Sequence, residues 1–97
     1  RNYDMTNINR LSSNQLVSYY LMSSYIYYVD NSHLESPLDD IEYDTLCKRL
    51  FDEWDNVDHP HKKLIDFNSL SAGTGFYLKD YPTIVKVASV DWVKSYV

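Results

Sequence analysis

The feature that most constrains the fold is a stripe of apolar side chains in the middle of the chain. It recurs at steps of three and four residues and consists of Tyr43, Leu46, Cys47, Leu50, Phe51, Trp54 and Val57. Because an α-helix completes a turn every 3.6 residues, this spacing places the stripe on one helix face. Acidic residues crowd its first turns, which suits the helix dipole. The pattern predicts a helix from about Asp39 to Val57, ended by His59-Pro60.

A second helix is expected before this one. Ser13 and Asn14 are good helix caps, and no Gly or Pro interrupts the chain from Gln15 to Asp30. The residues that recur there at helical spacing are Leu16, Tyr19, Tyr20, Ser23 and Tyr27. The aromatic and β-branched content leaves a strand open for the end of this segment. Asn31 to Glu35 is read as a loop, after which Ser36 or Asp39 caps the central helix.

The C-terminal third is expected to be helical in two places. His61 to Asp66 is read as a basic connection, and residues 69–73 as one helical turn closed by Gly73. A turn at residues 73–75 and a short extended segment at residues 76–78 follow. Pro82 can open a last helix that carries Val85, Ala88, Trp92 and Tyr96 on one side, although residues 83–87 also have strand propensity.

Length and composition limit the architecture to one small domain. The chain has 97 residues, enough for a single core near the lower size limit of stable domains. We expect a mainly α fold, a small helical domain of three to four helices packed around a helical hairpin. Residues 1–12 are polar and lack periodicity, so they are expected to form an N-terminal tail or arm, with the domain at residues 13–97.

The charge balance bears on possible partners. The 9 basic and 14 acidic residues give a net charge of −5, which argues against direct binding to nucleic-acid backbones. A cationic small molecule or a basic protein surface is compatible with it. One cysteine excludes an internal disulfide, and no apolar run is long enough to cross a membrane. We therefore expect a cytoplasmic protein; a start at Arg1 is compatible with a trimmed or longer product.

The segment from Tyr27 to Asp44 brings rings and carboxylates together. Asp40, Tyr43 and Asp44 are spaced i, i+3 and i+4, so they share one helix face, and Tyr27 and Tyr28 close the preceding helix. Such a pocket can bind a nicotinamide ribose, because carboxylates accept hydrogen bonds from ribose and carboxamide while rings stack on the pyridinium. The alternative is structural: Tyr43 in the core, Tyr27 packed, and both aspartates as helix-start charges.

A longer pattern carries a family resemblance. The matching segments are Tyr27-Tyr28-Val29, Asp39-Asp40-Ile41-Glu42-Tyr43-Asp44, Leu46, Leu50 and His59-Pro60. Their order resembles the small N-terminal domain, called Ia, of bacterial NAD⁺-dependent DNA ligases. The resemblance implies NAD⁺ or nicotinamide mononucleotide (NMN) as the cofactor and a role in DNA replication or repair. The residues that it implies as nucleotide contacts are Tyr27, Tyr28, Asp40, Tyr43 and Asp44.

The chain departs from that family in ways that bear on function. The loop between Tyr28 and Asp40 is longer than the family's, and together with the other departures this suggests a stand-alone relative of the kind that bacteriophages carry. The ligases use the lysine of a Lys-x-Asp-Gly motif in a separate adenylation domain, and this sequence contains no such motif. The resemblance thus implies recognition without catalysis by this chain alone. Activity as part of an NAD⁺-dependent DNA ligase stays open.

A second function of a different class fits the same residues. An acidic, tyrosine-rich interaction protein, such as a phage inhibitor or virion component, could reuse the fold to bind another protein in the host cytoplasm. His59-x-His61 has no third ligand at recognisable spacing, so we expect no metal site. Cys47 lies within the apolar stripe and is expected to be a small buried hydrophobe, so we expect no catalytic residue.

Overall fold

The computed structural model describes residues 11–29, 38, 40–73, 75, 77–79 and 81–96, without the side chains of Asp40, Ser95 and Tyr96. Its helices are α1 (Ser13–Tyr28), α2 (Asp40–Asp52), α3 (Phe67–Ser71) and α4 (Thr83–Tyr96). Two short 3₁₀ helices, η2 (Trp54–Asn56) and η3 (Pro60–Leu64), lie between α2 and α3. These residues contain no strand, and the expected small, mainly α fold is confirmed.

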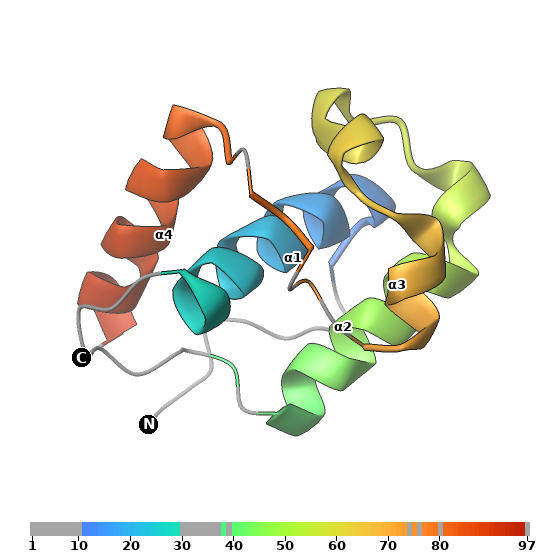
Figure 1. The fold of residues 1–97 in the computed structure, drawn as a ribbon, viewed down its shortest axis with the longest axis horizontal. Helices are drawn as coiled ribbons and strands as arrows, with labels where there is room; N and C mark the ends of the chain where they lie inside the picture. The colour runs from blue at the N-terminus through green and yellow to red at the C-terminus, as the bar shows by residue number, and fades with distance from the viewer. Residues whose placement is uncertain are drawn as a thin grey trace.

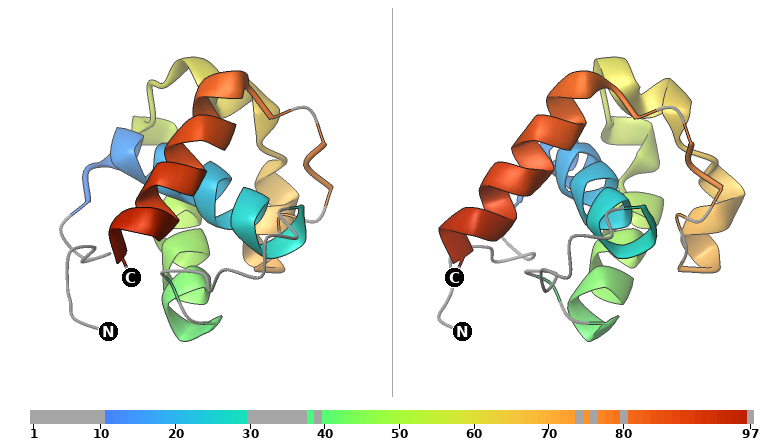
Figure 2. Two further views of the ribbon diagram at one scale, coloured as in Figure 1. Left: turned by 90° about the vertical axis from the view of Figure 1, so that its left-hand side faces the viewer. Right: turned by 60° about the vertical axis from the view of Figure 1, so that its left-hand side comes forward.

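Helix α1 lies at the centre of the molecule. Figure 1 shows α4 on one side of it and α2 and α3 on the other, and Figure 2 shows α4 lying across α1. Both α4 and α2 pack against α1, while α3 packs against α2. The core residues with no exposed surface are Leu16, Val17, Tyr20, Leu21, Leu46, Cys47 and Leu50. The predicted pair of helices is therefore the centre of the fold.

Helix α1 begins earlier than predicted. Ser12 is its N-cap, and its side chain accepts a hydrogen bond from the backbone N–H of Gln15. The Gln15 side chain accepts in return from the backbone N–H of Ser12, which completes a capping box. Leu11, assigned to the N-terminal segment from the sequence, packs against the core, and its carbonyl accepts a hydrogen bond from Arg49. Residues 1–10 of the expected tail lie outside the described residues.

Helix α2 ends sooner than the apolar stripe predicted. The α-helix stops at Asp52, and Glu53 takes the non-helical angles φ −102° and ψ 13°. The prediction of one helix to Val57 was wrong because the chain turns through η2, which lets Trp54 and Val57 contact the core from outside the helix. Lys62 fixes this turn by donating to the carbonyls of Trp54 and Val57.

The segment expected to be a basic connection forms η3. Pro60 occupies its first turn, and the Nδ1 atom of His59 caps it by accepting from the backbone N–H of His61 at 3.0 Å. Proline suits this position because its missing N–H would have had no helical partner. His59-Pro60 thus starts a new helical turn instead of ending α2.

The predicted helical turn before Gly73 and the last helix are confirmed, with α3 beginning two residues earlier than expected. The extended segment expected at residues 76–78 was wrong where the structure describes it, because Tyr77 lies in a turn that the Leu78 N–H closes by donating to the Gly75 carbonyl at 3.0 Å. Helix α3 is followed by Gly73 with φ +69°, a left-handed conformation that favours glycine. Residues 83–96 form α4 and not the alternative strand. Val85 and Val93 are buried against the rest of the fold, with Ser89 between them. Thr74 and Phe76 of the expected turn and extended segment lie outside the described residues.

Candidate functional site

Three of the five candidate residues contact one another. The rings of Tyr27 and Tyr28 meet edge to face, with centroids 4.9 Å apart and planes at 85°. The rings of Tyr27 and Tyr43 are stacked, with centroids 6.1 Å apart and planes at 22°. The end of α1 and the start of α2 therefore come together, as the sequence predicted.

Tyr43 is held on several sides. Its ring also stacks on Tyr20, two helical turns before Tyr27 on α1, so it packs against both α1 tyrosines. Its hydroxyl lies 2.8 Å from the Ser24 Oγ, and burial raises the pKa of the Tyr43 phenol well above its ordinary value. These contacts make Tyr43 a packing residue that joins α2 to α1.

A glycine makes this contact possible. A Cβ atom placed on Gly75 would lie 2.3 Å from the Ser24 Oγ and 2.9 Å from the Tyr43 hydroxyl. Both distances are shorter than non-bonded atoms allow, so only glycine fits without movement of its neighbours. The backbone at Gly75, which is buried, thus covers the Ser24–Tyr43 hydrogen bond.

The structure describes the side chain of Asp44 but not that of Asp40. Asp44 is exposed, and its carboxylate lies 3.0 Å from the Lys48 Nζ one turn later on α2. An added Cβ at Gly73 would lie 3.1 Å from the Asp44 Oδ1, so Asp44 stands beside the end of α3. Asp40 is the first residue of α2, but its side chain lies outside the described part. A pair of carboxylates facing the rings stays a prediction.

The tyrosine cluster is larger than the sequence indicated. The hydroxyls of Tyr20 and Tyr77 lie 3.2 Å apart, and the Tyr77 hydroxyl accepts from the backbone N–H of Asp66 at 2.7 Å. Tyr25 meets Tyr81 edge to face, with centroids 5.2 Å apart. No periodic pattern links Tyr77 or Tyr81 to α1, so these contacts could not be found without the tertiary structure.

Cys47 and His59 have structural contacts. Cys47 is fully buried, which raises the pKa of its thiol to about 12 and keeps it protonated. The Nε2 atom of His59 lies 3.3 Å from the Ser18 Oγ, while its Nδ1 caps η3. Among the described residues, no group of three or more His, Cys, Asp or Glu side chains is placed to hold a metal ion.

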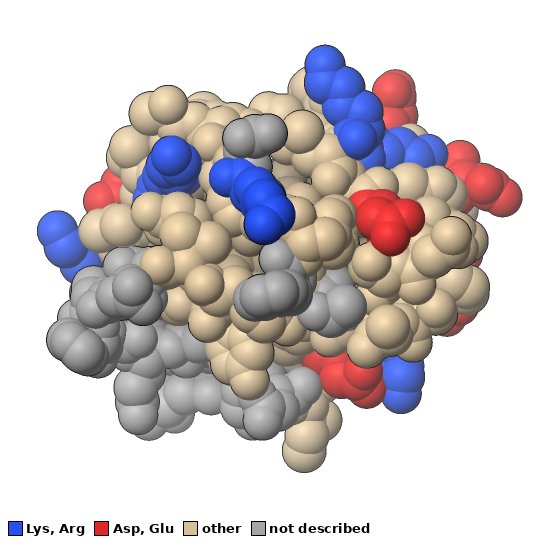
Figure 3. Space-filling model, viewed as in Figure 1, with Lys and Arg blue, Asp and Glu red and all other residues tan. Residues whose placement is uncertain are grey.

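The surface of the described residues shows no single dominant charge on the face of Figure 3. Blue and red side chains are interspersed there, and tan, uncharged residues cover much of the rest of the described surface. Within the described part of the chain, none of the helices has the length and apolar character needed to span a membrane.

Comparison with known proteins adds no further assignment. No protein-family model matches the chain, and no curated protein or solved structure matches it either.

Proposed function

We propose that this protein recognises a nicotinamide nucleotide, NMN or NAD⁺, at the junction of α1 and α2. The observation that supports the proposal is the perpendicular pair formed by Tyr27 and Tyr28. Tyr27 is 57% exposed although one of its faces stacks on Tyr43, so a flat ligand can reach it from the solvent side. Aromatic rings attract a cationic pyridinium through their quadrupole.

The packing supports different roles for the candidate residues in this proposal. Tyr43 supports the site by holding the Tyr27 ring in place, since its own ring and hydroxyl are engaged with α1. Tyr27 and Tyr28 supply the stacking surface, and Asp40 and Asp44 supply the negative charge and the acceptors for ribose or carboxamide. Asp44 must share its carboxylate between Lys48 and the ligand, which limits the affinity. The role is recognition and positioning, without a nucleophile of its own.

Calorimetric titration with NMN and with its uncharged reduced form, NMNH, tests this proposal. An exposed site that makes few contacts should bind NMN with a Kd of about 0.1–1 mM. Asp44→Asn should weaken NMN binding more than NMNH binding, because only NMN carries the pyridinium charge. Tyr28→Ala should weaken both ligands by a similar factor, because both can stack.

The matched control is Asp91→Asn, which removes an exposed charge from α4, away from the junction. It should leave both affinities unchanged. If NMN does not saturate at millimolar concentration, or if Asp44→Asn affects NMN and NMNH equally, the proposal is wrong.

One observation favours the alternative, a protein interface at the same end of the molecule. Ile41 is 77% exposed and Val29 is 42% exposed, so the start of α2 and the residue after α1 each present an apolar side chain to solvent. Ile41 is not one of the proposed nucleotide contacts, so Ile41→Ser separates the two functions. The interface would be established if Ile41→Ser abolished binding to a purified partner protein and the unaltered chain did not bind NMN. Unchanged partner binding by Ile41→Ser would exclude it.

A further inference from the structure

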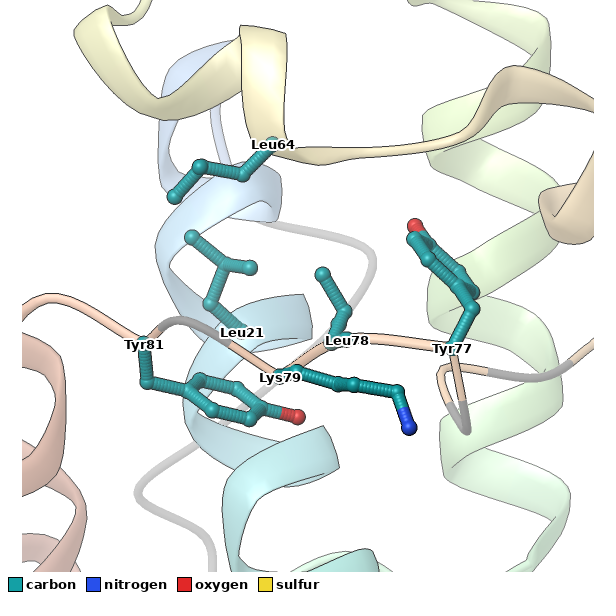
Figure 4. Close-up of a pocket in the computed structure, with 6 residues that line it drawn as sticks. All are labelled: Leu21, Leu64, Tyr77, Leu78, Lys79 and Tyr81. Carbon is teal, nitrogen blue, oxygen red and sulfur yellow. The ribbon is translucent and has the colours of Figure 1, made fainter.

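A cavity separate from the proposed nucleotide site lies between α1, the end of η3 and the segment that links α3 to α4. Its volume is about 270 Å³, and Figure 4 shows the side chains around it. The lining residues are Leu21, Leu64, Tyr77, Leu78, Lys79 and Tyr81. None of them belongs to the proposed nucleotide site. Three leucines, two phenols and one ammonium group therefore surround one small volume.

Tyr81 has an unusual hydroxyl. The residue is only 7% exposed, and its hydroxyl has no hydrogen-bond partner among the described residues. Tyr77, on the same segment, differs because its hydroxyl is bonded to the Asp66 backbone and lies beside the Tyr20 hydroxyl. Burying a hydroxyl without a hydrogen bond costs free energy, so most buried hydroxyls in folded proteins have a hydrogen-bond partner. Burial also raises the pKa of Tyr81, so its hydroxyl stays protonated and can donate.

Lys79 adds a positively charged side chain to the lining of the same cavity. It is the one exposed residue among the six that line the cavity, and it lies two residues before Tyr81 on the same segment (Figure 4). An exposed lysine changes rotamer readily, so it can move to admit an acceptor to the Tyr81 hydroxyl. An ammonium group and a neutral O–H together suit a carboxylate, which accepts from both. The leucines suit an apolar group attached to it.

We propose that this cavity binds a small organic anion, a carboxylate with an apolar body, whose oxygens accept from the Tyr81 hydroxyl and the Lys79 ammonium group. The apolar body lies against Leu21, Leu64 and Leu78. The volume limits the ligand to a compact molecule, since pockets for drug-sized ligands begin at about 300 Å³. This site does not depend on nucleotide recognition at the α1–α2 junction.

The test uses phenylacetate and its neutral amide, phenylacetamide, with the full chain observed by ¹H–¹⁵N NMR. Phenylacetate should produce saturable shifts centred on residues 77–81, with a Kd of about 1–10 mM. Phenylacetamide has the same apolar body without the charge and should bind at least about fivefold more weakly. Tyr81→Phe keeps the ring, removes the donor and should weaken phenylacetate about five- to tenfold. Lys79→Gln should weaken it about threefold or more.

Two controls keep the result interpretable. Lys94→Gln removes an exposed charge from the last turn of α4 and should not change phenylacetate binding. Tyr81→Phe should keep its Tm within about 2 °C of the unaltered chain, because no hydrogen bond is lost. A fall of more than about 5 °C would show that the hydroxyl is bonded within the fold and would overturn the proposal. Equal binding of the acid and the amide, or unchanged binding by Tyr81→Phe, would overturn it as well.

Discussion

Helices α1 and α2 differ in how much of their surface is buried. Helix α1 has buried side chains around most of its circumference, because α4 packs on one side and α2 on the other. Helix α2 buries Leu46, Cys47 and Leu50, while Ile41 on its other side reaches solvent. A helix that is covered on both sides needs no polar face, whereas a helix at the surface needs one.

The difference explains why the two helices were not equally clear in the sequence. The apolar stripe of α2 was visible because polar residues fill the remaining positions. In α1, serines occupy buried positions where other segments of the protein pack closely. Ser24 contacts Tyr43 of α2, and Ser23 is also buried. Polar residues at buried positions blur the apolar pattern, and the aromatic and β-branched residues near the end of this helix left a strand open.

The largest expected effect tests the one-sided burial of α2 directly. Leu16→Ala on α1 and Leu50→Ala on α2 should each lower the free energy of unfolding by about 2–5 kcal/mol, because both side chains are fully buried. Ile41→Ala should change it by less than about 0.5 kcal/mol. Urea denaturation monitored by circular dichroism measures all three. A loss at Ile41 as large as that at Leu50 would mean that α2 is covered on both faces.

A smaller effect concerns the contact between the two helices. Gly75→Ala should lower the free energy of unfolding by about 1–3 kcal/mol, because the new methyl group collides with Ser24 and Tyr43. Adding Ser24→Gly removes the two nearest of those atoms, so the double variant should lose less than the sum of the single losses. Denaturation of the three variants gives the coupling energy. Strict additivity would show that Gly75 and Ser24 do not touch in solution.

The smallest expected effect concerns Glu53, which forms an ion pair with Arg49 at the end of α2 and a hydrogen bond to the start of α1. Glu53 accepts hydrogen bonds from Arg49 of α2 and, at 2.7 Å, from the hydroxyl of Ser13 at the start of α1. The Arg49 hydrogen bond, followed by that of Ser13, lowers the pKa of Glu53 below its ordinary value of 4.5. The stabilisation is therefore fully present above this ordinary pKa and is lost as the pH falls through the lowered one.

Glu53→Gln should remove that part of the pH dependence. Between pH 7 and pH 3 the unaltered chain should lose about 0.2–1 kcal/mol more stability than the variant, the range typical of partly exposed pairs. Denaturation at a series of pH values checks the difference. Parallel curves for the two proteins would mean that Glu53 titrates alike in the folded and unfolded states.

The sequence was informative about the candidate site wherever neighbours on one helix carried the signal. The i, i+4 relation of Asp40 and Asp44 placed both on α2, and Tyr27 and Tyr28 closed α1 as expected. The packing of Tyr43 between α1 tyrosines depends on how two helices cross, and no local spacing contains that information. The nucleotide contacts themselves stay a prediction.

The sequence by itself determined the helical class, the central pair of helices, the last helix and the glycine that follows α3. Those features follow from 3.6-residue periodicity and from local cap and turn chemistry, which act over a few neighbouring residues. Only the tertiary structure decided that α2 stops at Asp52, that Gly75 covers Tyr43, and that Tyr81 and Lys79 share a cavity. Each of these depends on contacts between residues far apart in the chain, where close packing selects one arrangement and local propensity does not.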